Sequence, residues 1–301
     1  MFGRRTGLVA LLEEAGMLIN AGLTVILLLS AGGLVLPGFL RFMREHRLVD
    51  VNYRGEAIPT ACGLFLLLLL LMSYMLQKLT GWATLPSEAE FVLALVGVGM
   101  AGLIDDLIGD QKTKGIANHW KAWRQRGVPT TAVVKVAAVG AAGLMIGSED
   151  QPLTTLLLLQ VPLLLLTTNA VNLMDVRPGR ALKFYYLLLG LLLGAASFGS
   201  GASHAWNSQM GWTTVLPVTV AAVLLTHGDM KGRLMLGDTG ANLLGFTAGC
   251  GWVEYAPEAA QLALLLLLLG LHGLTWRRSL TRMIEKSRWL SFIDGIGRNR
   301  M

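Results

Sequence analysis

Polar side chains recur at a spacing of three residues where a long apolar run ends. The run covers residues 153–166 and is followed by Asn169, Asn172 and Asp175. Three steps along a helix turn a side chain by about −60°, so these groups share one face of the predicted helix. Amides and a carboxylate at a membrane boundary are costly without partners, which indicates a binding site. A polar helix end in contact with lipid headgroups is the alternative that these residues leave open.

Two adjacent carboxylates, Asp105 and Asp106, stand at the end of another apolar segment, residues 90–108. Like charges side by side are expensive in such a place, and this cost favours a functional role over a solvated helix end. Neighbouring helix residues point about 100° apart, so the two acids can have different partners. One of them would face a metal ion or a phosphate, while the other caps a helix or faces water.

A further acid, Asp238, lies between Gly237 and Gly240 at the start of residues 239–255. Glycines allow a backbone to approach a ligand closely, and the unpaired N–H groups of a helix start attract anions. This pattern favours an acid in contact with a ligand. The competing interpretation is an aspartate that caps its own helix.

The composition places these acids in a membrane protein. Hydrophobic residues are 53% and charged residues 15% of the 301 residues, and the mean hydropathy is +0.57. Leucine-rich segments along the whole chain predict an all-α, polytopic transmembrane helical bundle. Pro59 suits the first turn of the second span, because its missing N–H would be unpaired there. At about 20 residues for each crossing, the predicted spans are residues 17–42, 59–77, 90–108, 131–148, 153–173, 181–198, 212–227, 239–255 and 258–276.

The distribution of positive charge predicts the orientation of these nine spans. Every Lys and Arg except Arg4, Arg5 and Lys78 falls on one side of the predicted membrane. The positive-inside rule makes that side cytosolic, with the N-terminus outside and the C-terminus in the cytosol. The four acids all lie at cytosolic ends of spans, so we expect them to meet in one pocket at the inner (plasma) membrane of the cell.

The positive net charge of +6 does not indicate nucleic-acid binding, because the basic residues lie in short loops where they attract anionic lipid headgroups. Cys62 and Cys250 fall inside predicted spans without metal-site spacing. We interpret residues 1–301 as one membrane domain. Its end, at about 277–301, is predicted to be an amphipathic tail on the inner leaflet.

Carboxylates beside Lys and Arg at a lipid–cytosol boundary suit a divalent cation and phosphate groups. Hard oxygen ligands favour Mg²⁺, which binds through one or two carboxylates plus the phosphates of a substrate. If a lipid phosphate attacks a nucleotide diphosphate, a metal ion and cationic side chains reduce the repulsion between the two anions. The residues therefore support phosphoryl transfer at the membrane surface as a hypothesis.

Five motifs occur in an order that resembles the polyprenyl-phosphate N-acetylhexosamine-1-phosphate transferase superfamily (glycosyltransferase family 4), which includes the bacterial translocase that makes lipid I. The motifs are I-P-T-A-C-G at 58–63, G-L-I-D-D at 102–106, T-K-G-I-A-N-H-W-K at 113–121, N-A-V-N-L-M-D at 169–175 and L-G-D-T-G-A-N-L-L-G at 236–245. The resemblance implies a helical bundle with a cytosolic cleft. It also implies transfer of a sugar-1-phosphate from a UDP-sugar to a polyprenyl phosphate, with release of UMP, in the synthesis of a cell-envelope glycan such as peptidoglycan.

The resemblance also implies roles for single residues. Asp238 would bind Mg²⁺, Asp105 would handle the lipid phosphate and Asp106 would support it. On the other substrate, Asn172 and Asp175 would lie beside the nucleotide sugar.

The remaining substrate-binding candidates are Asn169, on the same motif, and Lys114, which the resemblance places at the diphosphate. The family usually continues this motif as D-G-L-D-G-L-A, whereas this chain reads D-V-R-P-G-R-A. Pro178 thus replaces an aspartate, and its side chain cannot form hydrogen bonds. Arg177 and Arg180 replace apolar residues, and we interpret them as phosphate-binding because guanidinium pairs bidentately with phosphate.

The family's histidine-rich loop and tenth span have no counterpart, and a tail with D-G-I-G-R at residues 294–298 follows the ninth span instead. Three functions remain open. They are a divergent transferase, a non-catalytic paralogue that binds polyprenyl phosphate or partners a cell-envelope assembly, and a transporter. The transporter is disfavoured because His272 and Lys135 are the only ionisable residues near the middle of a span. A homodimer and a monomer are both open.

Overall fold

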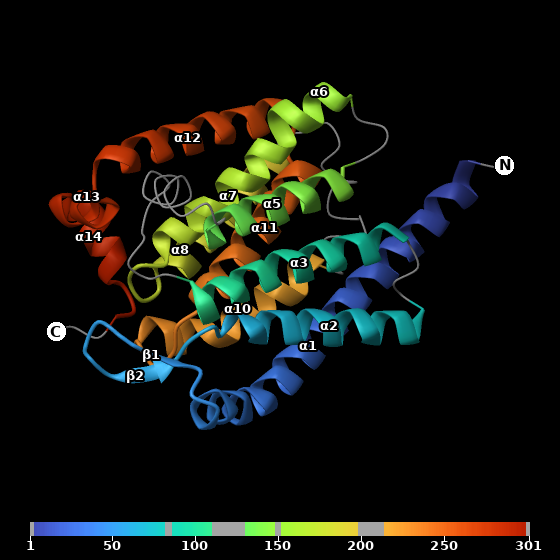
Figure 1. Cartoon of the computed structure of the whole chain (residues 1–301). Coiled ribbons are helices and arrows are strands. Elements are labelled where there is room, and N and C mark those ends of the chain that lie inside the picture. The colour runs from blue at the N-terminus through green and yellow to red at the C-terminus, as the bar shows by residue number, and fades with distance from the viewer. Residues whose placement is uncertain (1–2, 82–85, 110–129, 148–151, 198–213, 299–301) are drawn as a thin grey trace.

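Each segment that the sequence predicts to span a membrane overlaps a helix in the described part of the chain. The computed structural model describes residues 3–81, 86–109, 130–147, 152–197 and 214–298. In this part of the chain the helices lie side by side in a bundle (Figure 1). The helices are α1 Gly3–Glu45, α2 Gly63–Thr80, α3 Pro86–Ile108, α5 Thr131–Met145, α6 Leu153–Thr155, η1 Leu156–Gln160, α7 Val161–Met174, α8 Arg180–Ser197, α10 Leu216–Met230, α11 Gly237–Tyr255, α12 Glu258–Arg277, α13 Leu280–Lys286 and α14 Arg288–Gly295.

Six of the described helical segments are long and apolar enough to cross a membrane, judged by length and composition. They are α1, α2, α3, α8, α12 and the continuous run from α6 through η1 to α7. The helices α5 and α10 are apolar but shorter. The chain is therefore a helical membrane protein, and the number of crossings and their direction stay predictions.

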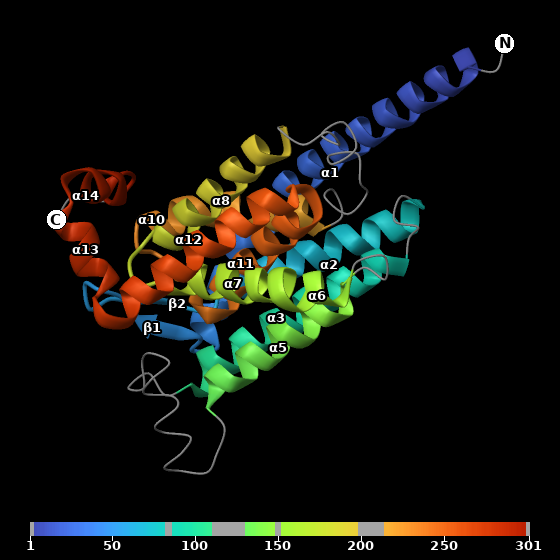
Figure 2. The same ribbon diagram turned by 90° about the horizontal axis from the view of Figure 1, so that it is seen from above.

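The helix α11 lies in the centre of the bundle (Figure 2). It contacts α2, α3, α7, α8 and α10, and residues 239–252 are buried without a break. A helix enclosed on all sides needs no polar stripe, and small residues let its neighbours approach closely. Gly245 shows this, because a Cβ atom there would lie 2.5 Å from the Cα atom of Thr168 on α7.

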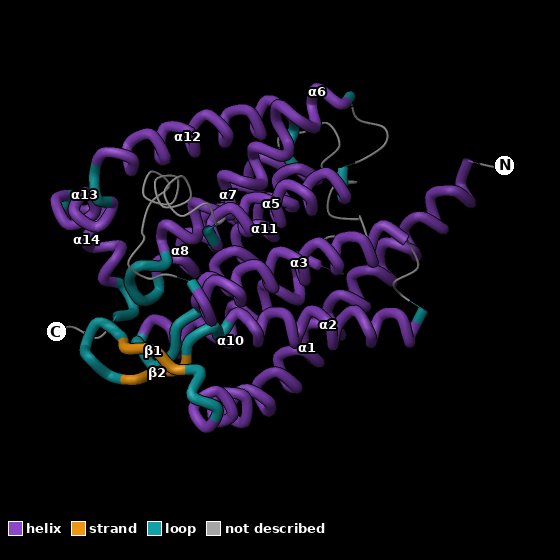
Figure 3. The backbone as a smooth tube through the Cα atoms, viewed as in Figure 1, coloured by secondary structure: helices purple, strands orange, loops and turns teal. Residues whose placement is uncertain are grey.

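A β-hairpin lies between α1 and α2 (Figure 3). The strands β1 (Val49–Val51) and β2 (Ala57–Pro59) pair antiparallel. The prediction that Pro59 lies in the first turn of the second helix is therefore wrong. The carbonyl of Pro59 accepts a hydrogen bond from the N–H of Met235 at 2.8 Å, and Ala61 has a left-handed φ of 53°. These features turn the backbone before α2 begins.

The side chain of Asn52 holds this hairpin to the segment between α10 and α11. Its Oδ1 atom accepts hydrogen bonds from the N–H groups of Arg54 and Glu56 within the turn. Its Nδ2 atom donates to the carbonyl of Gly232 at 3.0 Å. The sequence predicts a loop from residue 227, but α10 continues to Met230, so the connection to α11 is shorter than expected.

The tail forms two short helices, α13 and α14, where the sequence predicts one amphipathic helix. Ser287 separates them, and its side chain accepts a hydrogen bond from the N–H of Leu290 at the start of α14. Trp289 and Phe292 on α14 are 79% and 68% exposed, which agrees with an apolar stripe on this helix. Contact of α14 with a lipid surface stays a prediction. The tail and the β-hairpin lie at the same end of the bundle, called here the hairpin end (Figures 1 and 2).

The close contact between α11 and α7 predicts that Gly245→Ala destabilises the protein. The added methyl group would meet the backbone of Thr168, and overpacking of this kind costs about 1–3 kcal/mol. The melting temperature of the detergent-solubilised protein, followed by size-exclusion chromatography after heating, measures the loss. Gly270→Ala is the matched control, because no atom lies within 4 Å of a Cβ atom there. Equal melting temperatures for the two variants would contradict the packing.

Candidate functional site

Two acids from different helices meet at one lysine at the hairpin end. The ammonium group of Lys135, in the second turn of α5, lies 2.6 Å from Oδ2 of Asp105 on α3. The same nitrogen lies 2.7 Å from Oδ2 of Asp238 in the first turn of α11. One ammonium group therefore bridges two carboxylates that the sequence predicts to share a site.

These three side chains are enclosed but reachable. Lys135 is 17% exposed, Asp105 is 16% exposed and Asp238 is 28% exposed. Charges with so little water around them need partners of opposite sign. The ion pair with Lys135 supplies one such partner to each carboxylate. The remaining exposure leaves room for an anion or a cation to reach the group from the hairpin end.

The second acid of the pair, Asp106, has a different partner. Its Oδ1 atom accepts a hydrogen bond from the N–H of Asp238 at 2.7 Å. Its Oδ2 atom accepts from the N–H of Thr239 at 2.9 Å and from the hydroxyl of Thr239 at 2.5 Å. The carboxylate thus caps the N-terminus of α11 from another helix, and its charge is favourable there. Adjacent acids point in different directions, as the helix geometry predicts.

Two glycines make this cap sterically possible. Gly237 has a left-handed φ of 69°, and a Cβ atom there would lie 2.7 Å from the carboxylate of Asp106. A Cβ atom on Gly102 would lie 2.6 Å from the carbonyl oxygen of Asp238. Gly102 and Gly237 therefore allow α3 and α11 to pack closely, and an approach of the glycines to a ligand stays a prediction.

The polar residues of the central motif lie at the end of α7. Asn169 and Asn172 are half-buried on this helix, and Asp175 is its C-terminal cap residue, just past the last turn. Burial, together with the nearby carboxylates of Asp229, Asp238 and Asp106, raises the pKa of Asp175 well above its usual range. The side chain of Asp175 therefore keeps its proton to a higher pH than a free carboxyl group.

The two arginines of the central motif have partners within the protein. The guanidinium of Arg180 is 4% exposed and pairs with Asp294 of the tail at 2.7 Å. Arg177 lies 3.7 Å from Glu285. Contact of these arginines with a substrate stays a prediction, as it does for the other substrate-binding residues. Lys114, predicted to meet the diphosphate, lies outside the described residues.

Sequence reasoning missed three residues that organise this end of the bundle: Lys135, Asp229 and Asp294. Lys135 was detectable, because a lysine in the second turn of an apolar helix needs an acidic partner. Asp229 is 3% exposed and accepts a hydrogen bond from the N–H of Gly179 at 2.8 Å. Asp229 and Asp294 gave no comparable signal, because both lie outside the apolar runs, and the partners Gly179 and Arg180 are distant in sequence.

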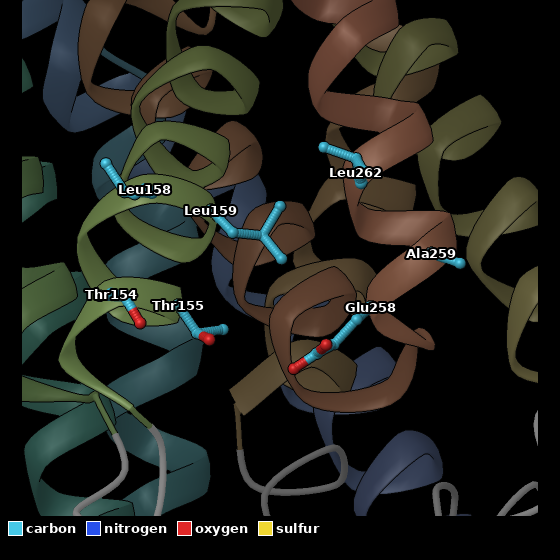
Figure 4. A pocket seen from close by; sticks show the side chains of 7 residues that line it. All are labelled: Thr154, Thr155, Leu158, Leu159, Glu258, Ala259 and Leu262. Carbon is cyan, nitrogen blue, oxygen red and sulfur yellow. The ribbon is translucent and has the colours of Figure 1, made fainter.

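A hollow that described residues line lies elsewhere in the bundle. A groove of about 440 Å³ lies between the start of the α6–η1 run and the start of α12 (Figure 4), away from the acids. Its lining consists of Thr154, Thr155, Leu158, Leu159, Glu258, Ala259 and Leu262. None of these residues is a predicted site residue, and the chemistry of the acidic site therefore does not involve this groove.

The acidic site suits a metal ion that is bound mainly by a substrate. Among the described residues, no group of three His, Cys, Asp or Glu side chains is arranged to hold a metal ion. Asp105 and Asp238 nevertheless converge on a single cationic nitrogen. Two carboxylates fit the way in which Mg²⁺ binds to proteins, with the other ligands supplied by phosphates and water.

The comparison with protein families agrees with this arrangement. The model of the family described as Glycosyl transferase family 4 matches residues 89–255, more than half of the chain. The matched region contains Asp105, Lys135, Asp175 and Asp238. The chain belongs to this family, within the polyprenyl-phosphate hexosamine-1-phosphate transferase superfamily. A search of the curated proteins gave no match.

The cap on α11 predicts a difference between the two neighbouring acids. Asp106→Asn replaces one carboxylate oxygen that accepts hydrogen bonds by an amide N–H₂ that cannot, and leaves one N–H group of α11 unpaired. We expect a loss of about 1–3 kcal/mol in stability. Asp105→Asn should cost less, because Lys135 keeps its ion pair with Asp238. Melting temperatures of the two purified variants in detergent test this order, and a less stable Asp105→Asn would contradict it.

Proposed function

We propose that the protein transfers a sugar-1-phosphate from a UDP-linked sugar to a polyprenyl phosphate at the cytosolic face of the cell membrane. One observation carries the proposal. Asp105 and Asp238 come from helices that are distant in sequence, yet both contact the ammonium group of Lys135. A cation between two partly exposed acids suits a reaction in which two anionic phosphates must approach each other.

The bond changes of this reaction assign work to the site. An oxygen of the lipid phosphate attacks the phosphorus that carries the sugar, the bond to the second phosphate breaks, and UMP leaves with the electron pair. Asp105 would orient the lipid phosphate, and Lys135 would reduce the repulsion between the two substrates. Asn172 and Asp175, at the end of α7, would hold the nucleotide sugar beside them.

The cofactor in this proposal is Mg²⁺. When bound, it would supply positive charge that stabilises the leaving phosphate. Asp238 would be its protein ligand, with Asp105 close enough to share it. The role of Asp106 in this proposal is to position Asp238, since its carboxylate binds the N–H group of that residue.

The proposal predicts that Asp105→Asn and Asp238→Asn abolish UMP release. Purified protein is incubated with Mg²⁺, a polyprenyl phosphate and a panel of UDP-sugars, and UMP is quantified. Loss of one preorganised charged group at a phosphoryl-transfer site lowers the rate by about 100-fold or more. Glu90→Gln is the matched control, because Glu90 is an exposed acid at the other end of α3.

The wild type decides between enzyme and binding protein. If it binds polyprenyl phosphate but releases no UMP with any sugar of the panel, the transferase proposal is overturned and a lipid-binding protein remains. Equal UMP release by the wild type and by Asp238→Asn would overturn the assignment of the site.

The bridging lysine predicts a metal-dependent stability in Lys135→Met. Without the ammonium group the two carboxylates repel each other, so this variant should melt below the wild type and regain part of the loss with MgCl₂. Melting temperatures with and without MgCl₂ measure the effect. Lys78→Met is the control, because Lys78 pairs more loosely, at 3.8 Å, with Glu88 on another part of the bundle. If the melting temperature of Lys135→Met does not change when MgCl₂ is added, a cation site between the acids is contradicted.

A further inference from the structure

The loop that follows the central motif is joined to the C-terminal tail by a partly buried ion pair. Both Nε and Nη2 of Arg180 bond to the two carboxylate oxygens of Asp294, at 2.7 and 2.8 Å. The remaining Nη1 atom donates to the hydroxyl of Thr281 on α13 at 3.0 Å. The guanidinium is 4% exposed, so its polar edge is already occupied by the tail.

A second arginine completes the junction. Arg298 bonds to both oxygens of the same Asp294 carboxylate, at 2.6 and 2.8 Å. Its Nε atom donates to the carbonyl of Pro178 at 2.7 Å. One carboxylate thus holds two guanidinium groups, and one of them is bonded to the loop backbone. Bidentate, charge-assisted pairs of this kind are the strong class of hydrogen bonds and fix direction as well as distance.

Lys183, in the first turn of α8, adds to this junction. Its ammonium group donates to the carbonyls of Ile293 and Asp294, at 3.0 and 2.8 Å. These carbonyls belong to the last turn of α14, where a positive charge is favourable. Burial alone would raise the pKa of Asp294, but the two guanidiniums hold it below its usual range.

The other side of the loop is held by α10. The N–H of Gly179 donates to Asp229 at 2.8 Å. The side chain of Met230 lies against two glycines in left-handed conformations, Gly179 and Gly297, with φ of 76° and 78°. A Cβ atom would lie 2.9 Å from Met230 at Gly179 and 2.6 Å at Gly297. The loop and the tail therefore close around the same residue.

This junction acts on the acidic site through a short stretch of backbone. Asp175 caps α7, and only two residues separate it from Pro178, whose carbonyl Arg298 binds. Asp229, which holds Gly179, is also one of the carboxylates close enough to act on Asp175. Two residues of backbone therefore connect Asp175 to a loop that the tail contacts.

We propose that the C-terminal segment, residues 278–298, is a positioning element of the acidic site. Asp294 is its positioning residue: by binding Arg180 and Arg298 it fixes the loop of residues 177–180, and with it Asp175, for the nucleotide sugar. This inference rests on the proposed transferase function. It gives the R-P-G-R loop a role in holding the tail, instead of a direct contact with phosphate.

The test compares Asp294→Asn, Glu285→Gln and the charge exchange Arg180→Asp with Asp294→Arg. Glu285→Gln is the matched control, because Glu285 lies in the same tail, is 57% exposed and, among the described residues, pairs only loosely with Arg177 at 3.7 Å. Two readouts are measured on each full-length protein. The first is tryptic cleavage in the tail, after Arg282, Lys286 and Arg288. The second is KM and kcat for UMP release, for each substrate separately.

We expect Asp294→Asn to expose the tail to trypsin and to raise KM for the UDP-sugar about tenfold, since a small displacement of positioning groups is costly. KM for polyprenyl phosphate should change less than twofold, because Asp105 and Lys135 are not attached to the tail. The charge exchange should restore part of the protection and lower KM for the UDP-sugar toward the wild-type value, because the pair between positions 180 and 294 can form again while Arg298 loses its carboxylate partner. A purely structural role for the salt bridge would lower the amount of active protein without separating the two KM values.

Other results overturn the inference. If trypsin cleaves the tail of Asp294→Asn but KM for the UDP-sugar is unchanged, the tail does not position the site. If the tail of Asp294→Asn stays protected from trypsin, the salt bridge does not hold the tail. Direct contact of Arg180 with phosphate would appear as a charge exchange that restores tail protection but not KM. Absence of UMP release from the wild type is a different result, which overturns the proposed function and this inference together.

Discussion

The structure depends on one contact, in which the carboxylate of Asp106 on α3 binds the N-terminus of α11. A helix N-terminus leaves N–H groups unpaired, and little water is available to satisfy them between packed helices. Asp106 on α3 accepts two of these N–H groups of α11 and a hydroxyl group besides. Gly102 and Gly237 leave the space for it. Because Asp238 lies in the same first turn of α11, the contact that joins the helices also places this acid opposite Asp105.

The acids of the site obey the same rule, that a charge in apolar surroundings needs a partner. Lys135 satisfies Asp105 and Asp238 together. Their partial exposure means that substrate phosphates can compete for the lysine and a metal ion can compete for the acids. In the proposed function, the stability of this end of the bundle and the binding of phosphates would involve the same three side chains. Family membership, from the match over residues 89–255, and this geometry support one another.

The hairpin end is assembled from segments that are far apart in the chain. The hairpin is held through Asn52 to the connection that precedes α11, and the tail is held through Asp294 to the loop that follows α7. Along the chain, both attachments lie within six residues of an acidic residue, Asp238 in the first case and Asp175 in the second. The bundle supplies the helices that carry the acids, and these attached segments limit the positions that the helix ends adopt.

The sequence by itself determined the class of protein, the positions of the helices and the family, because apolar runs and short motifs are local signals that need no knowledge of packing. It also indicated that Asp105 and Asp106 would point in different directions. The tertiary structure alone decided the partners. Lys135 is 30 residues from Asp105 and 103 from Asp238, and Arg180 is 114 residues from Asp294. The β-hairpin was also unforeseen, since its three-residue strands carry no periodicity and are held by a distant loop. Such contacts depend on how helices pack in space, and no spacing along the chain encodes that packing.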